Sequence, residues 1–296
     1  MENKRKLAFT TLGCPEWSFT RILDEAQNMG FSGIEIRGLE DKMLAEEIIQ
    51  FFPEQKTATL TALKDHNLEM VGFGSSVSFH QQDKFDAMLA EGKRAIDVCQ
   101  FMGIPFVRIF GDRLPPGEEE TSVISRVAKG AGILAEYGEE KGVMVLLETH
   151  GDFITLRRIR SVFDQVRSKN LRLLWDVGNT DFTYGDNFME FYQPLKDLIV
   201  HTHFKDHIRG IPGDEKTYKY CRLGEGQIPI KTIVKQLLAD NYNGYFCLEW
   251  EKKWHPELPG AEIAYPDFVR ILSEGMNFTL GFSEYHTQGR QQASDS

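Results

Sequence analysis

The sequence predicts an α/β protein in which eight parallel strands close into a (β/α)8 barrel, formed as a single domain over residues 1–296. Short apolar runs rich in β-branched and aromatic residues alternate with longer stretches of helical periodicity, as in repeated strand–helix units. The alternation occurs eight times, whereas an open doubly wound sheet usually has about five or six strands. No Gly-x-Gly-x-x-Gly motif follows the first apolar run, which also disfavours the open sheet.

The predicted strands are the short apolar runs themselves. In chain order they are Leu7–Thr11, Gly33–Arg37, Glu69–Phe73, Phe106–Phe110, Met144–Glu148, Arg172–Asp176, Ile199–His203 and Tyr245–Glu249. Several of the intervening helices are closed by residues that reach the left-handed conformation at low cost, namely Gly30, Gly103, Gly142 and the pair Asn243-Gly244. The barrel core therefore spans about residues 7–275.

Two segments fall outside this repeat. Ile208–Gln227 contains Pro212, Gly213, Gly224 and Gly226, and its length predicts a functional loop on the top of the barrel. The polar tail over about residues 284–296 is expected to be loosely held.

Composition limits the classes of function. With 41% hydrophobic and 26% charged residues, the chain has enough apolar material for a large core. Its net charge of -10 opposes binding to nucleic acid, because phosphate backbones need clustered Lys and Arg. The four cysteines show no Cys-x-x-Cys spacing and are expected to be reduced. The charged N-terminus and the lack of an apolar run of about 20 residues predict a cytoplasmic protein without a signal peptide or membrane span.

Metal-capable side chains end the last four predicted strands. They are Glu148, Asp176, His203 and Glu249. The carboxyl ends of barrel strands share one face, which is where barrel enzymes place their active sites. A single buried carboxylate could equally be part of a salt bridge, but a cluster of them repels itself without a cation. The pattern therefore predicts a divalent metal site at this face.

Three carboxylates and one imidazole make a hard, oxygen-rich set of donors. Such a set favours Mn2+ or Mg2+, and Zn2+ or Co2+ would also fit. A metal held in this way keeps positions open for the adjacent carbonyl and hydroxyl oxygens of a substrate, and would stabilise an enediolate.

At these residues the sequence resembles the xylose isomerase-like barrel superfamily, in its sugar isomerase and epimerase branch. The opening Thr11-Leu-Gly-Cys-Pro-Glu-Trp-Ser-Phe and the later Gly30-Phe-Ser-Gly-Ile-Glu-Ile-Arg37 are similar to the family's first strand, helix and second strand. In that family the last four strands supply Glu, Asp, His and Glu ligands, which match Glu148, Asp176, His203 and Glu249 in order. The resemblance favours His203 as the ligand over His201, which points to the same face one layer deeper and has a core or supporting role.

The resemblance also implies roles beyond metal binding. Glu148 and Glu249 would double as the acid/base pair that moves a proton at a carbon next to a carbonyl. Asn179 and Arg209 occupy the family's positions for residues that reach substrate oxygens. Asn179 departs from the family's pattern, in which a His is often found at this position.

Other polar and aromatic residues near the strand ends carry weaker expectations. His150 could contact substrate or only start a loop, and Trp17 and Trp250 could wall a sugar pocket or fill the core. Lys205 and Asp206 are expected to support the ligands or form a salt bridge. Arg37 could face the pocket or form part of the rim, and Glu251 could point toward the site or into solvent.

The function expected from these residues is that of a metal-dependent isomerase or epimerase acting on a small sugar or polyol, in a chain that could form homo-oligomers. A lyase on the same scaffold, such as an inosose, dehydroshikimate or 3-keto-sugar lyase, would use the same metal and base. A non-catalytic sugar-binding barrel is disfavoured because all four ligands and Arg209 are present. An apurinic-site endonuclease would need a trinuclear zinc cluster with further His ligands, one of them where this chain has Asn179.

Overall fold

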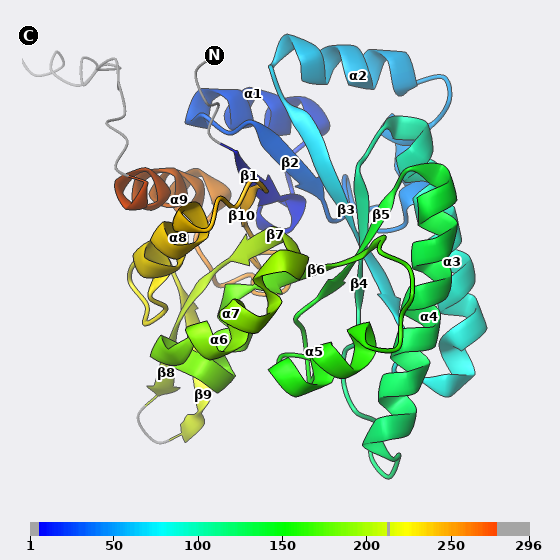
Figure 1. The fold of residues 1–296 in the computed structure, drawn as a ribbon. Coiled ribbons are helices and arrows are strands. Elements are labelled where there is room, and N and C mark those ends of the chain that lie inside the picture. Colours follow the sequence, from blue (N-terminus) through cyan, green and yellow to red (C-terminus); the bar gives the residue numbers. More distant parts are fainter. Residues whose placement is uncertain (1–5, 212–213, 277–296) are drawn as a thin grey trace, which may run out of the picture.

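Eight parallel strands are hydrogen-bonded in the closed order β1-β10-β7-β6-β5-β4-β3-β2, with the helices outside them (Figure 1). The computed structural model describes residues 6–211 and 214–276. The barrel strands are β1 (Leu7–Thr10), β2 (Gly33–Ile36), β3 (Glu69–Ser78), β4 (Phe106–Phe110), β5 (Met144–Glu148), β6 (Leu171–Asp176), β7 (Ile199–Phe204) and β10 (Phe246–Leu248). The predicted (β/α)8 barrel and its eight strands are confirmed, although β3 ends at Ser78 rather than at Phe73.

The described α-helices follow the strands around the outside of the barrel. They are α1 (Phe19–Met29), α2 (Lys56–Asp65), α3 (Phe85–Met102), α4 (Glu120–Lys141), α5 (Leu156–Phe163), α6 (Val177–Tyr184), α7 (Met189–Leu195), α8 (Ile230–Ala239) and α9 (Ala261–Gly275). Short 3-10 turns occupy Thr11–Gly13, Ala45–Glu47, Ile49–Phe51, Gln82–Lys84, Gly185–Asn187 and Lys196–Leu198. None of the helices in the described residues is both long enough and apolar enough to cross a bilayer.

Left-handed residues end several helices as predicted. Gly30, Gly103 and Gly142 lie directly after α1, α3 and α4 with φ values of 84°, 74° and 68°. The prediction for Asn243-Gly244 is wrong, because α8 ends earlier and the left-handed residue after it is Asn241, with φ 59°.

The segment predicted as a loop between β7 and α8 is largely an antiparallel hairpin of β8 (Asp206–Ile211) and β9 (Asp214–Cys221). In Figure 1 this hairpin projects from the barrel beside α6. The carboxylate of Asp206 accepts hydrogen bonds from the backbone N–H groups of Gly224, Gly226 and Ile228. One buried side chain thus ties the chain after the hairpin to its first residue. The predicted tail over residues 284–296 lies outside the described residues.

Side chains along each barrel strand point alternately outward, toward the helices, and inward, into the barrel. Outward side chains, such as Ile34 and Ile36 of β2, join the main core between the sheet and the helices. The inward side chains form separate small clusters, made by Ala8, Val71 and Cys247 and by Phe106, Leu146 and Leu174. Because successive residues of a strand point to opposite faces, a residue two positions further along a regular strand also points inward. Two positions after Phe106, Leu146, Leu174 and Cys247 lie the charged residues of the site, Arg108, Glu148, Asp176 and Glu249.

Candidate metal centre and active site

The structure brings together the four side chains that the sequence placed at the ends of the last strands. Glu148 and Asp176 are the last residues of β5 and β6, His203 lies in β7, and Glu249 directly follows β10. Each offers one ligand atom, and these atoms all lie within 4.8 Å of one another. All four side chains are buried. The closure of the barrel therefore concentrates three carboxylates and one imidazole in a space that one ion could fill.

The chemistry of this group fits a divalent cation. Nδ1 of His203 has no hydrogen-bond partner, and lies 3.3 Å from Oε1 of Glu249 and 3.6 Å from Oε1 of Glu148. A nitrogen lone pair facing two carboxylate oxygens is a poor contact unless a proton or a cation lies between them. Burial alone would lower the pKa of His203, but Glu35 and Glu249 raise it well above its ordinary value. A proton and a metal ion would therefore compete for the same nitrogen.

Glu35, on β2, supports the imidazole from within the barrel and was not singled out from the sequence. Its Oε2 accepts hydrogen bonds from Nε2 of His203 at 2.9 Å and from Nε2 of His201 at 2.8 Å. These bonds place the protons on Nε2 and leave Nδ1 of His203 free for a cation. Burial alone would raise the pKa of Glu35, but the two imidazoles lower it well below its ordinary range. His201 thus lies one layer deeper than His203 and contacts Glu35.

Glu35 also belongs to a second group of metal-capable side chains. It is formed by Glu35, His201, His203 and Cys247, and it shares His203 with the first group. Burial raises the pKa of the Cys247 thiol well above its ordinary value, which disfavours the thiolate that binds metals. We therefore assign this group to holding His203 in place.

Lys205 forms ion pairs with two of the candidate ligands, Asp176 and Glu249. Its Nζ lies 2.8 Å from Oδ2 of Asp176, 2.7 Å from Oε2 of Glu249 and 2.6 Å from Oε1 of Glu251, and the side chain is 3% exposed. Burial raises the pKa of Asp176 to about 7 despite this contact. Burial would also raise the pKa of Glu249, but Lys205 and His203 lower it well below its ordinary value. Glu249 is thereby held ionised.

Arg108, on β4, is a second buried cation that the sequence did not single out. Its Nε lies 3.0 Å from Oε2 of Glu148, and its guanidinium stacks 3.9 Å from the centre of the Phe110 ring. In the sequence Phe-Val-Arg-Ile-Phe it alternates with apolar residues, as Glu35 does in Gly-Ile-Glu-Ile. A charged residue between outward-facing apolar residues of a barrel strand must point inward, and this signal could have identified both.

The residues expected from the resemblance to contact substrate are held by other protein groups. The amide of Asn179 donates to Oδ2 of Asp176 at 2.9 Å, while the backbone N–H of Asn179 donates to Oδ1. Asp176 is thus oriented by the first turn of α6, of which it is the N-cap. Arg209, on β8, pairs with Asp181 at 3.2 Å and keeps a partly exposed side chain.

The remaining three expected contact residues lie around the barrel mouth. Nδ1 of His150 lies 3.5 Å from Oδ1 of Asp112, and the imidazole contacts the Phe110 ring. Trp250 is buried, and its Nε1 donates to the carbonyl of Pro259. Trp17 is buried against Tyr265 beneath the guanidinium of Arg21. The structure does not bring these two tryptophans into the metal-capable group.

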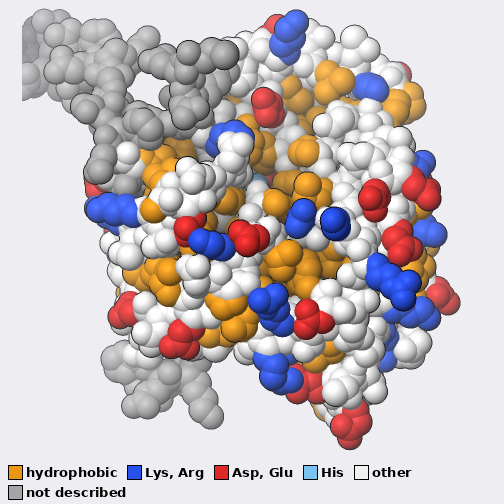
Figure 2. All heavy atoms as spheres, in the orientation of Figure 1, with side chains coloured by type: hydrophobic (Ala, Val, Ile, Leu, Met, Phe, Trp, Pro, Cys, Tyr) orange, Lys and Arg blue, Asp and Glu red, His pale blue; other side chains and the backbone are white. Residues whose placement is uncertain are grey.

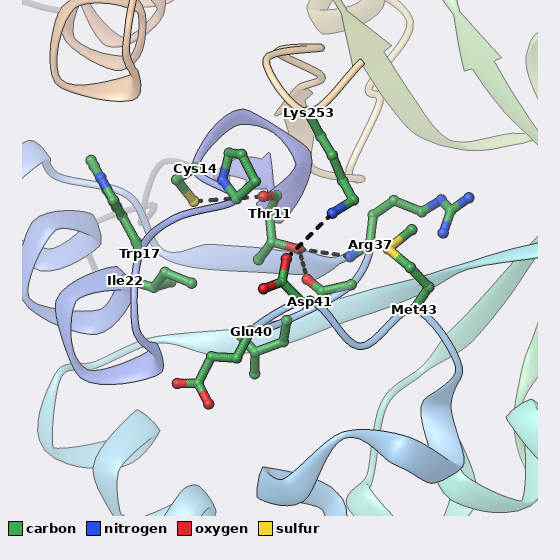
Figure 3. Close-up of a pocket in the computed structure, with 12 residues that line it drawn as sticks. Thr11, Cys14, Trp17, Ile22, Arg37, Glu40, Asp41, Met43 and Lys253 are labelled. Carbon is green, nitrogen blue, oxygen red and sulfur yellow. Dashed lines mark hydrogen bonds and ion pairs between the residues drawn. The ribbon is translucent and has the colours of Figure 1, made fainter. Parts of the chain in front are cut away.

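A small pocket of about 10 Å³ lies at the ends of β1 and β2 (Figure 3), and none of the four metal-capable side chains lines it. Trp17 and Cys14 line one side, and Asp41 and Lys253 approach each other at 3.9 Å across it. Burial raises the pKa of Cys14 to about 12, so its thiol stays protonated and is no candidate ligand. On the face shown in Figure 2, Lys and Arg side chains are interspersed with Asp and Glu rather than gathered into one basic surface.

Comparison with known proteins shows the family of this chain. The family model described as "Xylose isomerase-like TIM barrel" matches residues 23–268. The chain belongs to this family. It is 24% identical over 264 residues to an inosose dehydratase of Clostridium botulinum (strain Alaska E43 / Type E3), covering 80% of this chain and 83% of that protein. It is 28% identical over 165 residues to an inosose dehydratase of Lactiplantibacillus plantarum, covering 50% and 54% of the two chains.

Several solved structures share the fold. A probable 3-DHS dehydratase from Bacillus anthracis superposes with a TM-score of 0.72 at 20% identity, over 90% of this chain and 98% of that one. A D-tagatose 3-epimerase-like protein gives a TM-score of 0.73 at 17% identity, over 92% and 97%. A family member from Mycobacterium smegmatis, solved in complex with magnesium, gives 0.67 at 15% identity, over 92% and 98%. Dehydratases and epimerases thus share this barrel.

Proposed function

We propose that this chain is a divalent-metal-dependent lyase that removes water from a keto-polyol. The observation that carries the proposal is the convergence of Glu148, Asp176, His203 and Glu249 within 4.8 Å at the carboxyl ends of their strands. The family match makes the chain a sugar-converting barrel, and the similarity to inosose dehydratases over most of its length favours dehydration over the isomerase activity expected from the sequence.

The four side chains would hold one cation, with Mn2+ or Mg2+ preferred because most of the donors are carboxylate oxygens. When bound, the cation would supply positive charge opposite the oxygens of the substrate, where negative charge develops as a proton is removed. Glu35 would keep Nδ1 of His203 directed toward it.

Glu249 is the proposed base. Lys205 and His203 keep its carboxylate ionised although it is buried, so it can accept a proton from the carbon next to the substrate carbonyl. The same carboxyl group would then return the proton to the β-hydroxyl, which leaves as water while a double bond forms. Lys205 contacts both Asp176 and Glu249, so it fixes the base relative to the cation ligands.

Epimerisation or isomerisation is the second candidate, and a specific arrangement favours it. Glu148 and Glu249 approach Nδ1 of His203 from strands that are separated by β6 and β7. Two carboxyl groups placed in this way could serve opposite faces of one carbon, with one removing the proton and the other returning a proton.

A single experiment separates the two reactions. The purified protein is incubated in D2O with an inosose, a ketose or an aldose, with Mn2+ or with a chelator, and followed by NMR and by the ultraviolet absorbance of a conjugated carbonyl. A lyase gives Mn2+-dependent absorbance and loss of water, whereas an epimerase or isomerase gives deuterated sugar without water loss. Neither reaction in the presence of Mn2+, or full activity of E249Q, would refute the proposal.

A further inference from the structure

Arg37 is a buried cation whose side chain enters the barrel beside the metal-capable group. It directly follows β2, two positions after Glu35, so it has the same inward orientation. The residue is 8% exposed. In Figure 3, Arg37 lines the small pocket at the barrel mouth, while its guanidinium points away from Asp41 and Lys253.

Arg37 lies next to the other buried guanidinium, that of Arg108. A Cβ atom added at Gly74 would lie 2.8 Å from Nη2 of Arg108 and 2.8 Å from Cδ of Arg37. A side chain at position 74 would therefore displace one arginine or both. The absence of a side chain there allows two like charges to share one wall of the site.

The two arginines differ in how their charge is balanced. Arg108 is paired with Glu148, as described above. The guanidinium of Arg37 donates through Nη2 to the hydroxyl of Ser76 at 3.0 Å, but its Nη1 is buried and has no hydrogen-bond partner. Within residues 6–211 and 214–276, no carboxylate forms an ion pair with it. A buried cation without a counter-charge is costly, so an arginine kept in this state points to a partner that arrives from outside.

Three carboxylates act on Arg37 through space, those of Glu249, Glu148 and Glu91. Glu249 and Glu148 belong to the metal-capable group, and the half-buried Glu91 is hydrogen-bonded to the backbone of Ser76. Burial and the neighbouring Arg108 lower the pKa of Arg37 to about 10, which leaves it charged at neutral pH.

We propose that Arg37 binds an anionic oxygen of the substrate, carried by a carboxylate or a phosphate group. A guanidinium presents parallel N–H donors that match either group, and Nη1 has a free donor. This inference rests on the proposed function and narrows its substrate from any keto-polyol to one that bears an acidic group. The polyol part would face the cation ligands, and the acidic group would face Arg37 and Arg108.

The test is calorimetric binding of three polyhydroxylated ring compounds to the full-length protein, with and without Mn2+. The probes are quinate, which carries a carboxylate, myo-inositol 1-phosphate and uncharged myo-inositol. The variants are R37M, which removes the charge, and R37K, which keeps the charge but loses the paired donors. R167M is the matched control, because Arg167 is an exposed arginine that follows α5.

We expect one of the two charged probes to bind the wild type and R167M at least tenfold more tightly than myo-inositol. R37M should abolish this preference, R37K should reduce it at least threefold, and the probe that binds more tightly identifies the acidic group. Equal binding of charged and uncharged probes, no binding of either charged probe, or a preference that survives in R37M would overturn the inference. If R37M does not fold, as judged by circular dichroism, the charge preference of R37K decides. A preference reduced at least threefold supports the inference, and an unchanged preference overturns it.

The failure of this inference can be distinguished from failure of the proposed function. If the wild type shows no preference for charged probes, or if R37M keeps that preference, while Mn2+-dependent water loss is intact, only the role of Arg37 is refuted. Absence of any Mn2+-dependent chemistry would remove the proposed function, while the titrations without Mn2+ would still show whether Arg37 selects an anion.

Discussion

Glu35 and His203 lie on strands β2 and β7, and their side chains meet inside the barrel with Oε2 of Glu35 2.9 Å from Nε2 of His203. The carboxylate fixes which imidazole nitrogen carries the proton, and so directs the other nitrogen toward Glu148 and Glu249. Metal-binding histidines are commonly oriented by such a second hydrogen bond.

Replacing Glu35 with Ala should weaken the binding of Mn2+ by about 10–100-fold, because His203 loses the bond that orients it. Titration of metal-free protein with Mn2+ measures the change. Glu69→Gln is the control, since Glu69 is an exposed carboxylate at the opposite end of a barrel strand. Unchanged affinity in E35A would show that His203 is held without Glu35.

Loading the protein with Mn2+ at about 100 times its Kd should stabilise the fold by about 2.7 kcal/mol, through preferential binding to the native state. The gain appears as a higher Tm in thermal unfolding, and a chelator should reverse it. His203→Ala should remove the gain, whereas His66→Ala, at a surface histidine paired with Asp24, should keep it. A shift of equal size in H203A would place the metal elsewhere.

Binding of Mn2+ should weaken as the pH falls below 7. Burial raises the pKa of Asp176 to about 7, and the pKa of His203 is raised above its ordinary value, so both hold protons in mildly acidic solution. A cation needs the deprotonated forms, and affinity should fall about tenfold per pH unit for each proton displaced. The check is the Kd for Mn2+ at pH 8, 7 and 6, and a constant Kd would contradict it.

Lys205→Met should destabilise the metal-free protein by about 3–5 kcal/mol, because it leaves the buried carboxylates of Asp176 and Glu249 without their shared cation. Bound Mn2+ should recover part of the loss. Urea unfolding with and without Mn2+ measures both values. Lys196→Met removes a partly exposed ion pair with Asp240 and should have a much smaller effect. Similar losses in the two variants would argue against a special role for Lys205.

Asp206→Ala should loosen the hairpin, because four backbone N–H groups, those of Gly224, Gly226, Ile228 and His207, lose their carboxylate acceptor. The local cost is about 1–3 kcal/mol for the buried donors that are left unpaired. Hydrogen exchange followed by mass spectrometry should become faster over the region around β8 and β9, and stay unchanged in β4 and β5. Asp186→Asn, at an exposed aspartate, is the control. Uniformly faster exchange would indicate global destabilisation instead.

The sequence by itself determined the barrel and the four candidate ligands. Strand–helix alternation is a local property of the chain, and the carboxyl ends of parallel strands in a barrel share one face, so Glu148, Asp176, His203 and Glu249 could be placed together without coordinates. Glycines such as Gly30 and Gly103 could be read as helix ends, because a helix often ends in one left-handed residue and glycine adopts that conformation at low cost.

Only the tertiary structure decided which side chains support those ligands. Closing the sheet brings Glu35 from β2 onto His203 from β7, and Arg108 from β4 onto Glu148 from β5, and these pairings depend on strand register and on which residues fill the barrel. The same packing leaves Nη1 of Arg37 without a partner. Hydrogen bonds and charge pairs act over a few ångströms, so they are fixed by the packed fold and not by spacing along the chain.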